Sequence, residues 1–161
     1  MLSTKMQGTI NAQIGAEMWS AYLYLSMAMD AEVLGLKGVS SWYRKQYDEE
    51  MAHAFKFIGY MAEQNARVEL KPIAEVPTQW GCPVKMFEQT LAHEKKVTSL
   101  IWNLCDIAAE EKDYATTNFL QYYVKEQVEE EATAQGILDA MKMVEGDKAA
   151  FYMLDKELGK R

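Results

Sequence analysis

The sequence predicts an all-α fold, in which two antiparallel helical hairpins joined by a long crossover form a four-helix bundle and a short fifth helix follows at the C-terminus. The 161 residues include only 9 Gly and 3 Pro, so the chain has few places to turn sharply. Apolar residues recur in alternating steps of four and three, which is the spacing of one helix face. The length and the even composition predict a single domain over residues 1–161.

The first hairpin consists of helices predicted over residues 4–33 and 39–65. Ser3 or Thr4 is a candidate N-cap for the first of them. Glycines mark the gap between the two helices, and a connection of about four residues permits only an antiparallel arrangement.

Residues 66–83 are predicted to form the crossover loop, and all three prolines lie in it. About 18 extended residues at roughly 3.3 Å each reach about 60 Å, whereas a helix of about 28 residues rises only about 42 Å. The crossover can therefore run the whole length of the bundle, so the third helix starts at the same end as the second.

The second hairpin consists of helices predicted over residues 84–111 and 114–144, and a short helix over 147–158 follows it. Asp113 and Asp147 are candidate N-caps for the last two. The fifth helix is too short to be stable alone, so its apolar stripe is expected to pack against neighbours.

Composition argues against several classes of function. The 17 Lys plus Arg against 24 Asp plus Glu give a formal net charge of −7, so binding to nucleic acid is not expected. No apolar run approaches the roughly 18 residues of a membrane span. Cys82 and Cys105 cannot form a CxxC pair, and the N-terminal residues do not resemble a secretory leader. We therefore expect reduced thiols and a cytoplasmic location.

Polar side chains interrupt the apolar stripe of each long helix near its middle. Glu50 and His53 form a Glu-x-x-His motif, whose i, i+3 spacing points both side chains at one spot. The motif is weak alone, and the specific signal is its coincidence with acids on the other three helices. Glu94 follows His93, which we expect to be peripheral or at the surface. The interrupting side chains are Glu17, Glu50, His53, Glu94, Gln127 and Glu130.

These carboxylates favour a metal centre over a metal-free scaffold with protonated acids. An ionised carboxylate in an apolar interior costs several kcal/mol unless a counter-charge meets it. No Lys or Arg lies on the four stripes, and two divalent ions would balance four carboxylates. Oxygen ligands with one imidazole and no thiolate suit Fe or Mn better than a structural Zn site.

Further residues border this cluster. Glu49, Glu126 and Glu129 would flank it from two neighbouring helices, which indicates a third cation position or an exit route, with an ordinary solvated face as the alternative. Tyr24 lies one to two turns beyond Glu17 on the same face. Tyr24 would either be an ordinary core residue, or its hydroxyl would hydrogen-bond a metal ligand or donate an electron to the site.

The sequence resembles the ferritins and, within them, the bacterial non-haem ferritins. The long crossover and the short fifth helix match that family as well. The resemblance implies a ferritin-like fold and an iron-storing ferroxidase, which oxidises Fe(II) to Fe(III) with O2 or H2O2. It also implies a hollow cage of twenty-four subunits in which ferric mineral is deposited. The matching residues are Glu17, Tyr24, Glu49-Glu50-Met51-Ala52-His53, Glu94, Asn118-Phe119-Leu120-Gln121 and Glu126-Gln127-Val128-Glu129-Glu130.

The resemblance also implies roles for individual residues and a cofactor content of two ferroxidase irons with a third iron site. Glu17, Glu50 and His53 would hold the first iron. Glu50, Glu94 and Glu130 would hold the second. Gln127 would be the nearby amide that orients oxygen species. The third site would comprise Glu49, Glu126, Glu129 and Glu130. The fifth helix would pack around the four-fold axis of the cage.

Departures from related families narrow this assignment. Gln127 and Glu130 stand where the haem-containing bacterioferritins repeat Glu-x-x-His, which favours storage over a retained catalytic cofactor. Met51 lies at the haem-binding position of bacterioferritin, so haem is an alternative, although we do not expect it. Cys82 and Cys105 cannot supply the four-Cys iron site of a rubrerythrin. The small DNA-protecting cage ferritins lack the fifth helix.

Overall fold

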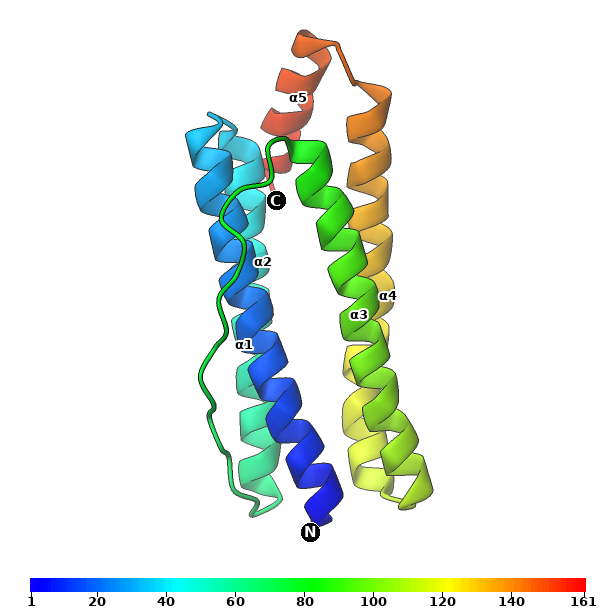
Figure 1. The fold of residues 1–161 in the computed structure, drawn as a ribbon. Helices are drawn as coiled ribbons and strands as arrows, with labels where there is room; N and C mark the ends of the chain where they lie inside the picture. Colours follow the sequence, from blue (N-terminus) through cyan, green and yellow to red (C-terminus); the bar gives the residue numbers. More distant parts are fainter.

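The computed structural model describes residues 1–161 and contains five α-helices and no strands. Four long helices run side by side and a short fifth helix folds back over one end of the bundle (Figure 1). This architecture confirms the predicted all-α fold of two hairpins with a fifth helix. The helices are α1 Thr4–Val33, α2 Lys37–Glu63, α3 Pro83–Glu110, α4 Tyr114–Met143 and α5 Lys148–Leu158.

The helix boundaries agree with the prediction for α1 and differ by one or two residues elsewhere. α2 begins at Lys37, two residues earlier than predicted, because a side chain from α5 caps its first turn. It ends two residues earlier because Asn65 adopts a left-handed conformation with φ 56°. Pro83 lies in the first turn of α3 rather than in the crossover, a position that suits its missing N–H group.

Side-chain caps fix the starts of three helices. The Ser3 hydroxyl accepts a hydrogen bond from the backbone N–H of Met6 at 3.0 Å at the start of α1. Asp113 and Asp147 cap α4 and α5 in the same way. All three were candidate caps from the sequence, so local capping chemistry explains where these helices begin.

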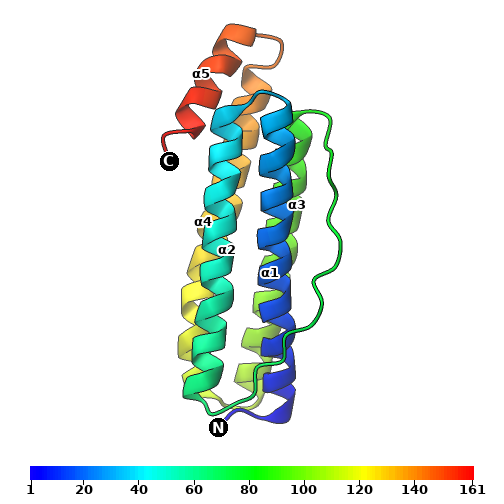
Figure 2. The same ribbon diagram turned by 90° about the vertical axis from the view of Figure 1, so that its left-hand side faces the viewer.

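The crossover, residues 64–82, runs along the outside of α1 from one end of the bundle to the other (Figure 2). Side chains of α1 hold it in place. The side-chain oxygen Oδ1 of Asn11 accepts from the backbone N–H of Glu69 at 2.8 Å, and the Ser26 hydroxyl donates to the backbone oxygen of Pro77 at 2.7 Å. α3 therefore starts at the same end as α2, which confirms the predicted connectivity.

The buried apolar side chains form two clusters, one toward each end of the bundle. On α1, Ile14 belongs to one cluster and Leu23 to the other, and Glu17 lies between them. On α2, Phe57 and Tyr43 belong to the two clusters in the same way. The polar residues that interrupt the four stripes thus form a middle layer between two apolar cores.

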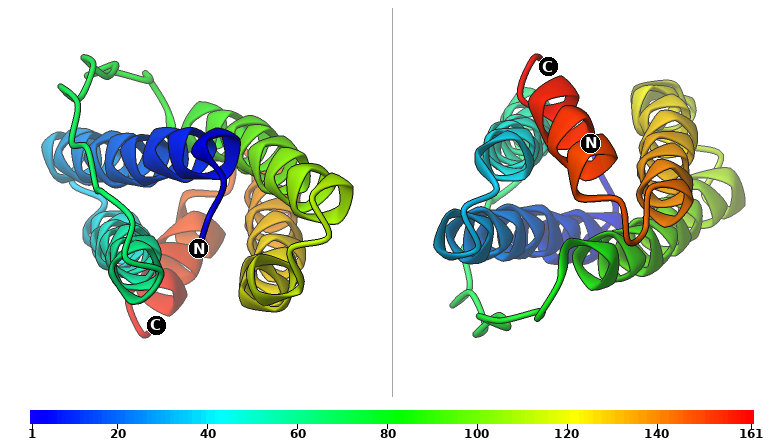
Figure 3. Two further views of the ribbon diagram at one scale, coloured as in Figure 1. Left: turned by 90° about the horizontal axis from the view of Figure 1, so that it is seen from below. Right: turned by 90° about the horizontal axis from the view of Figure 1, so that it is seen from above.

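α5 lies across the end of the bundle beside α2 (Figure 3). The Asp155 carboxylate accepts hydrogen bonds from the backbone N–H groups of Gly38 at 3.1 Å and Val39 at 2.9 Å. The residue that precedes α2, Leu36, provides no side-chain cap. Asp155 therefore caps α2 from α5. Leu158 is buried against the same chain, whereas packing around a four-fold axis stays a prediction.

None of the five helices combines the length and the hydropathy that crossing a membrane requires.

Candidate metal centre

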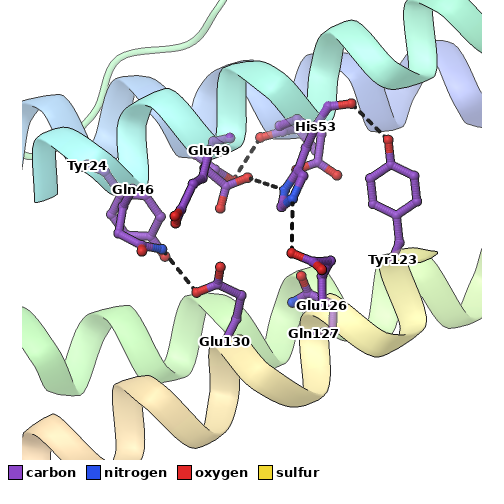
Figure 4. A network of polar contacts seen from close by, with 12 residues as sticks. Tyr24, Gln46, Glu49, His53, Tyr123, Glu126, Gln127 and Glu130 are labelled. Carbon is purple, nitrogen blue, oxygen red and sulfur yellow. Dashed lines mark hydrogen bonds and ion pairs between the residues drawn. The ribbon is translucent and has the colours of Figure 1, made fainter. Parts of the chain in front are cut away.

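Glu17 from α1 and the Glu-x-x-His pair from α2 meet in the middle layer. One ligand atom from each of Glu17, Glu50 and His53 lies within 4.8 Å of the others, and all three side chains are buried. His53 Nδ1 lies 3.5 Å from Glu50 Oε2 and 4.0 Å from Glu17 Oε2. Figure 4 shows the His53 ring at the centre of these contacts. The sequence predicted this convergence from the i, i+3 spacing of Glu50 and His53 and from the position of Glu17 on the apolar stripe of its own helix.

Two carboxylate oxygens in this group have no hydrogen-bond partner although they are buried. They are Glu17 Oε2 and Glu50 Oε2, the same atoms that face His53 Nδ1. The other oxygen of Glu17 accepts from Gln13 Nε2 at 2.8 Å. Buried polar atoms are normally paired, and unpaired ones call for an explanation. Two such oxygens beside one ring nitrogen are a donor set that fits a divalent cation.

Glu94 from α3 enters the layer with two hydrogen-bond donors directed at it. Tyr24 Oη donates to Glu94 Oε1, and Gln127 Nε2 donates to Glu94 Oε2 at 3.2 Å. Gln127 also donates to the backbone oxygen of Glu94 at 3.2 Å. Tyr24 is therefore a hydrogen-bonding partner of a predicted ligand rather than a core residue alone, and Gln127 faces Glu94 with its amide nitrogen.

Glu130 from α4 is held by a residue whose contact with the site was not predicted. Gln46 Nε2 donates to Glu130 Oε2 at 3.0 Å, and the Gln46 side chain is fully buried (Figure 4). Gln46 lies on the apolar stripe of α2, four residues before Glu50. A buried amide one helical turn from a predicted ligand was the signal that could have identified it.

The acids next to this layer line a pocket of about 320 Å³ that opens to solvent. His53 connects the two regions, because Nδ1 faces the inner acids while Nε2 lies 3.8 Å from Glu126 Oε2. The structure thus brings the predicted outer acids to one place. Arg161 also lines the pocket, and no motif in the sequence marked it. We call this the outer pocket; its ionisable side chains include those of Glu49, His53, Glu126, Glu129, Glu130 and Arg161.

Burial and mutual repulsion govern the protonation of the inner acids. Burial raises the pKa of Glu17 well above its ordinary value, and the neighbouring Glu50 charge raises it further. Burial likewise raises the pKa of Glu50 and of Glu94. Burial, followed by the Glu94 charge, raises the pKa of Glu130 to about 7. Without a cation the layer therefore retains protons, which a bound metal would displace.

Two neighbouring groups stay uncharged. Burial, followed by the Glu94 charge, raises the pKa of Tyr24, so its hydroxyl remains a hydrogen-bond donor. Burial lowers the pKa of His93 to about 4, and its Nε2 lies 2.7 Å from the Ser20 hydroxyl. His93 lies outside the cluster, as expected, but it is half-buried rather than superficial, because its ring packs against Trp19 with centroids 5.3 Å apart.

The fold and this layer define a class of protein: four-helix bundles with one long crossover, in which core acids and a Glu-x-x-His motif form a candidate metal site. Within that class, the family model described as Ferritin-like domain matches residues 7–144. The chain belongs to this family. Its broad function is iron storage, and the family resemblance found in the sequence is confirmed.

Known proteins of this family resemble the chain along its full length. A bacterial non-heme ferritin of Bacteroides fragilis (strain 638R) is 48% identical over 161 residues, which are 100% of both chains. The bacterial non-heme ferritin of Campylobacter jejuni subsp. jejuni serotype O:2 is 36% identical over 97% of this chain and 93% of its own. A solved structure of an open pore ferritin from the hyperthermophilic archaeon Archaeoglobus fulgidus has a TM-score of 0.99 at 47% identity, covering 100% of this chain and 99% of its own.

Proposed function

We propose that the chain is a ferroxidase subunit that oxidises Fe(II) to Fe(III) with O2 or H2O2 at a di-iron centre inside the bundle. Residues 1–161 would act as one ferritin-like domain. The single observation that carries the proposal is the pair of buried, unpaired oxygens, Glu17 Oε2 and Glu50 Oε2, beside His53 Nδ1. A cation at this point would satisfy all three atoms at once.

Glu17, Glu50 and His53 would hold the first Fe(II), and Glu50 would bridge to a second Fe(II) held with Glu94 and Glu130. The charges support this ligand set, because four carboxylates balance two divalent ions. The raised pKa of the buried acids shows how unfavourable their charges are in the absence of a counter-ion. Each iron gives up one electron. The two electrons and two protons reduce O2 to H2O2, or H2O2 to two molecules of water.

The protein's own contribution is to hold the ligands in position before iron binds. Gln13 holds one oxygen of Glu17, and Gln46 holds one oxygen of Glu130. Tyr24 and Gln127 hold Glu94 between them. Residues that orient ligands through hydrogen bonds normally contribute to metal affinity. The Gln127 amide would also orient an oxygen species beside the second iron, and its contact with Glu94 supports this role.

Glu49, Glu126 and Glu129 would provide, with Glu130, a third cation position in the outer pocket. Because the His53 ring contacts both this pocket and the inner acids, the pocket would give iron a route between solvent and the di-iron centre. Fe(III) that leaves the centre would be deposited as mineral.

The mineral would be stored inside a homo-oligomeric cage of twenty-four subunits, as the ferritin family resemblance implies. Exposed apolar side chains on α1, including Tyr22 and Met29, line a groove against the crossover and support association between copies. We also place the protein in the cytoplasm, since both cysteines are free thiols.

Anaerobic loading with Fe(II) followed by exposure to air tests this function. The wild type should oxidise iron in a fast phase and keep the product in solution. The double variant Glu50→Ala, His53→Ala should oxidise iron at least about tenfold more slowly. Glu110→Ala is a matched control, because Glu110 is an exposed acid that pairs with Lys5 at 2.9 Å. Equal oxidation rates in the wild type and the double variant would rule out the proposed centre.

A further inference from the structure

Arg161 follows α5 in the chain and reaches back to the middle of α2. Its Nη2 lies 2.8 Å from Glu49 Oε2 and 3.1 Å from Glu49 Oε1, and its Nη1 donates to Gln46 Oε1. The guanidinium carbon lies 5.1 Å from the centre of the Trp42 ring. Three different contacts therefore seat this side chain, which is 33% exposed.

This guanidinium is the one Lys or Arg group among the residues that line the outer pocket, where four glutamates gather. The like charges of these acids repel one another in the absence of a cation. Arg161 neutralises part of that charge through Glu49. An incoming divalent ion would therefore meet a carboxylate that the guanidinium already occupies.

Arg161 also determines which way the Gln46 amide points. Arginine has donors and no acceptor, so the atom of Gln46 that faces it must be the carbonyl oxygen Oε1. The amide nitrogen is then directed at Glu130, to which it donates at 3.0 Å. Arg161 therefore contacts Glu49 directly and affects Glu130 through Gln46, which connects it to two of the four acids in the pocket.

We infer that Arg161 is a displaceable counter-ion of the outer pocket, which an entering divalent cation must release from Glu49. This inference rests on the proposed function, because it concerns the route by which cations reach the inner ligands. Arg161 lowers the affinity of the outer pocket for a cation and offsets part of the negative charge of the empty pocket. A cation bound there is consequently held loosely enough to move on.

The test is calorimetric titration with Zn(II), a redox-inert probe, on the intact assembled protein at low ionic strength. Arg161→Gln keeps much of the side-chain length but removes the charge, and should tighten binding at the outer pocket about twofold to fivefold. Arg161→Lys keeps a positive charge and should stay closer to the wild type. Lys160→Gln is the matched control, because Lys160 pairs with Glu157 at 2.8 Å and is 71% exposed.

Two further measurements separate this role from a merely structural one. The effect of Arg161→Gln should disappear in a Glu49→Gln background, since the competition is for that carboxylate. It should also shrink at an ionic strength on the order of 0.5 M, where exposed charges are screened. The melting temperature without metal shows whether Arg161 simply anchors α5.

The outcomes are distinct. Zn(II) affinities that are equal in Arg161→Gln and Lys160→Gln, or weaker binding in Arg161→Gln, would overturn the inference, even with a lowered melting temperature. Zn(II) bound at the inner ligands but not in the wild-type outer pocket would also overturn it, and would leave the proposed ferroxidase centre standing. A wild type that neither binds Zn(II) nor oxidises Fe(II) would overturn both.

Discussion

The backbone oxygen of Asp155 in α5 occupies the space where a Cβ atom of Gly38 in α2 would lie. A Cβ built on Gly38 would be 1.6 Å from that oxygen. The Asp155 carboxylate meanwhile accepts from the Gly38 N–H group at 3.1 Å. This contact permits no side chain at position 38, and it fixes the position of α5 against α2. The chain continues from α5 to Arg161, which lies at the outer pocket.

Gly38→Ala should displace α5 from the bundle and remove the cap of α2. Overpacking and the lost cap should together lower the free energy of unfolding by about 2 kcal/mol, measured by denaturant titration. Gly136→Ala in α4 is the control, because a Cβ there meets nothing within 4 Å. It should leave stability unchanged or raise it slightly. Equal stabilities of the two variants would contradict the Asp155 contact.

The metal-free protein should lose stability as pH rises through the neutral range. The pKa of Glu130 is raised from 4.5 to about 7 by burial and by the Glu94 charge, so folding favours its protonated form. That contribution is fully present below about pH 4.5 and is lost as pH rises through about 7. On the order of 3 kcal/mol is involved for this group.

Melting temperatures of the metal-free protein between about pH 5 and about pH 8 test this pH dependence. Glu130→Gln, which cannot ionise, should show a weaker decline. Saturating Zn(II) should reverse the trend, because a bound cation favours the ionised carboxylates. A melting temperature that rises with pH in the metal-free protein would show that these acids are not held protonated.

Tyr24→Phe should weaken the binding of the second iron while leaving the first nearly unchanged. The variant removes the hydroxyl that donates to Glu94 but keeps the ring in its buried position. A loss of about tenfold in affinity is typical for removing a group that orients a metal ligand. Anaerobic Fe(II) titration measures it. Tyr43→Phe is the control, because the Tyr43 hydroxyl contacts Thr90 at 3.0 Å rather than an acid. Identical titrations of the two variants would contradict the role of Tyr24.

Local signals in the sequence were sufficient to predict the bundle and the inner acids. Breaker residues and caps such as Asp113 locate the helix ends, because both act within a few residues of the chain. The four-three apolar spacing then places Glu17, Glu50 and Glu94 on the inward faces of their helices, and all three are buried. Helical periodicity thus predicts which residues of each helix face the core of the bundle.

The contacts around the outer pocket could not be predicted in this way. Arg161 and Glu49 are separated by 112 positions, and Arg161 lies beyond the last helix, where no periodic pattern applies. Gln46 was visible as a polar residue on the α2 stripe, but its partner on α4 depends on how the two hairpins pack. The sequence does not distinguish Asp155 from an ordinary surface acid, because its role as a cap depends on how α5 packs against α2.

We propose that the buried acids hold Fe(II) while O2 or H2O2 oxidises it, and that an assembly of this chain stores the product. Size-exclusion chromatography with mass determination, combined with iron content after aerobic loading, tests assembly and mineral together. We expect iron to elute with a large homo-oligomer, in amounts far above the three sites that the ligands of one subunit could provide. Iron binding that saturates at or below three ions per subunit, or iron that precipitates away from the protein, would contradict the proposed storage function.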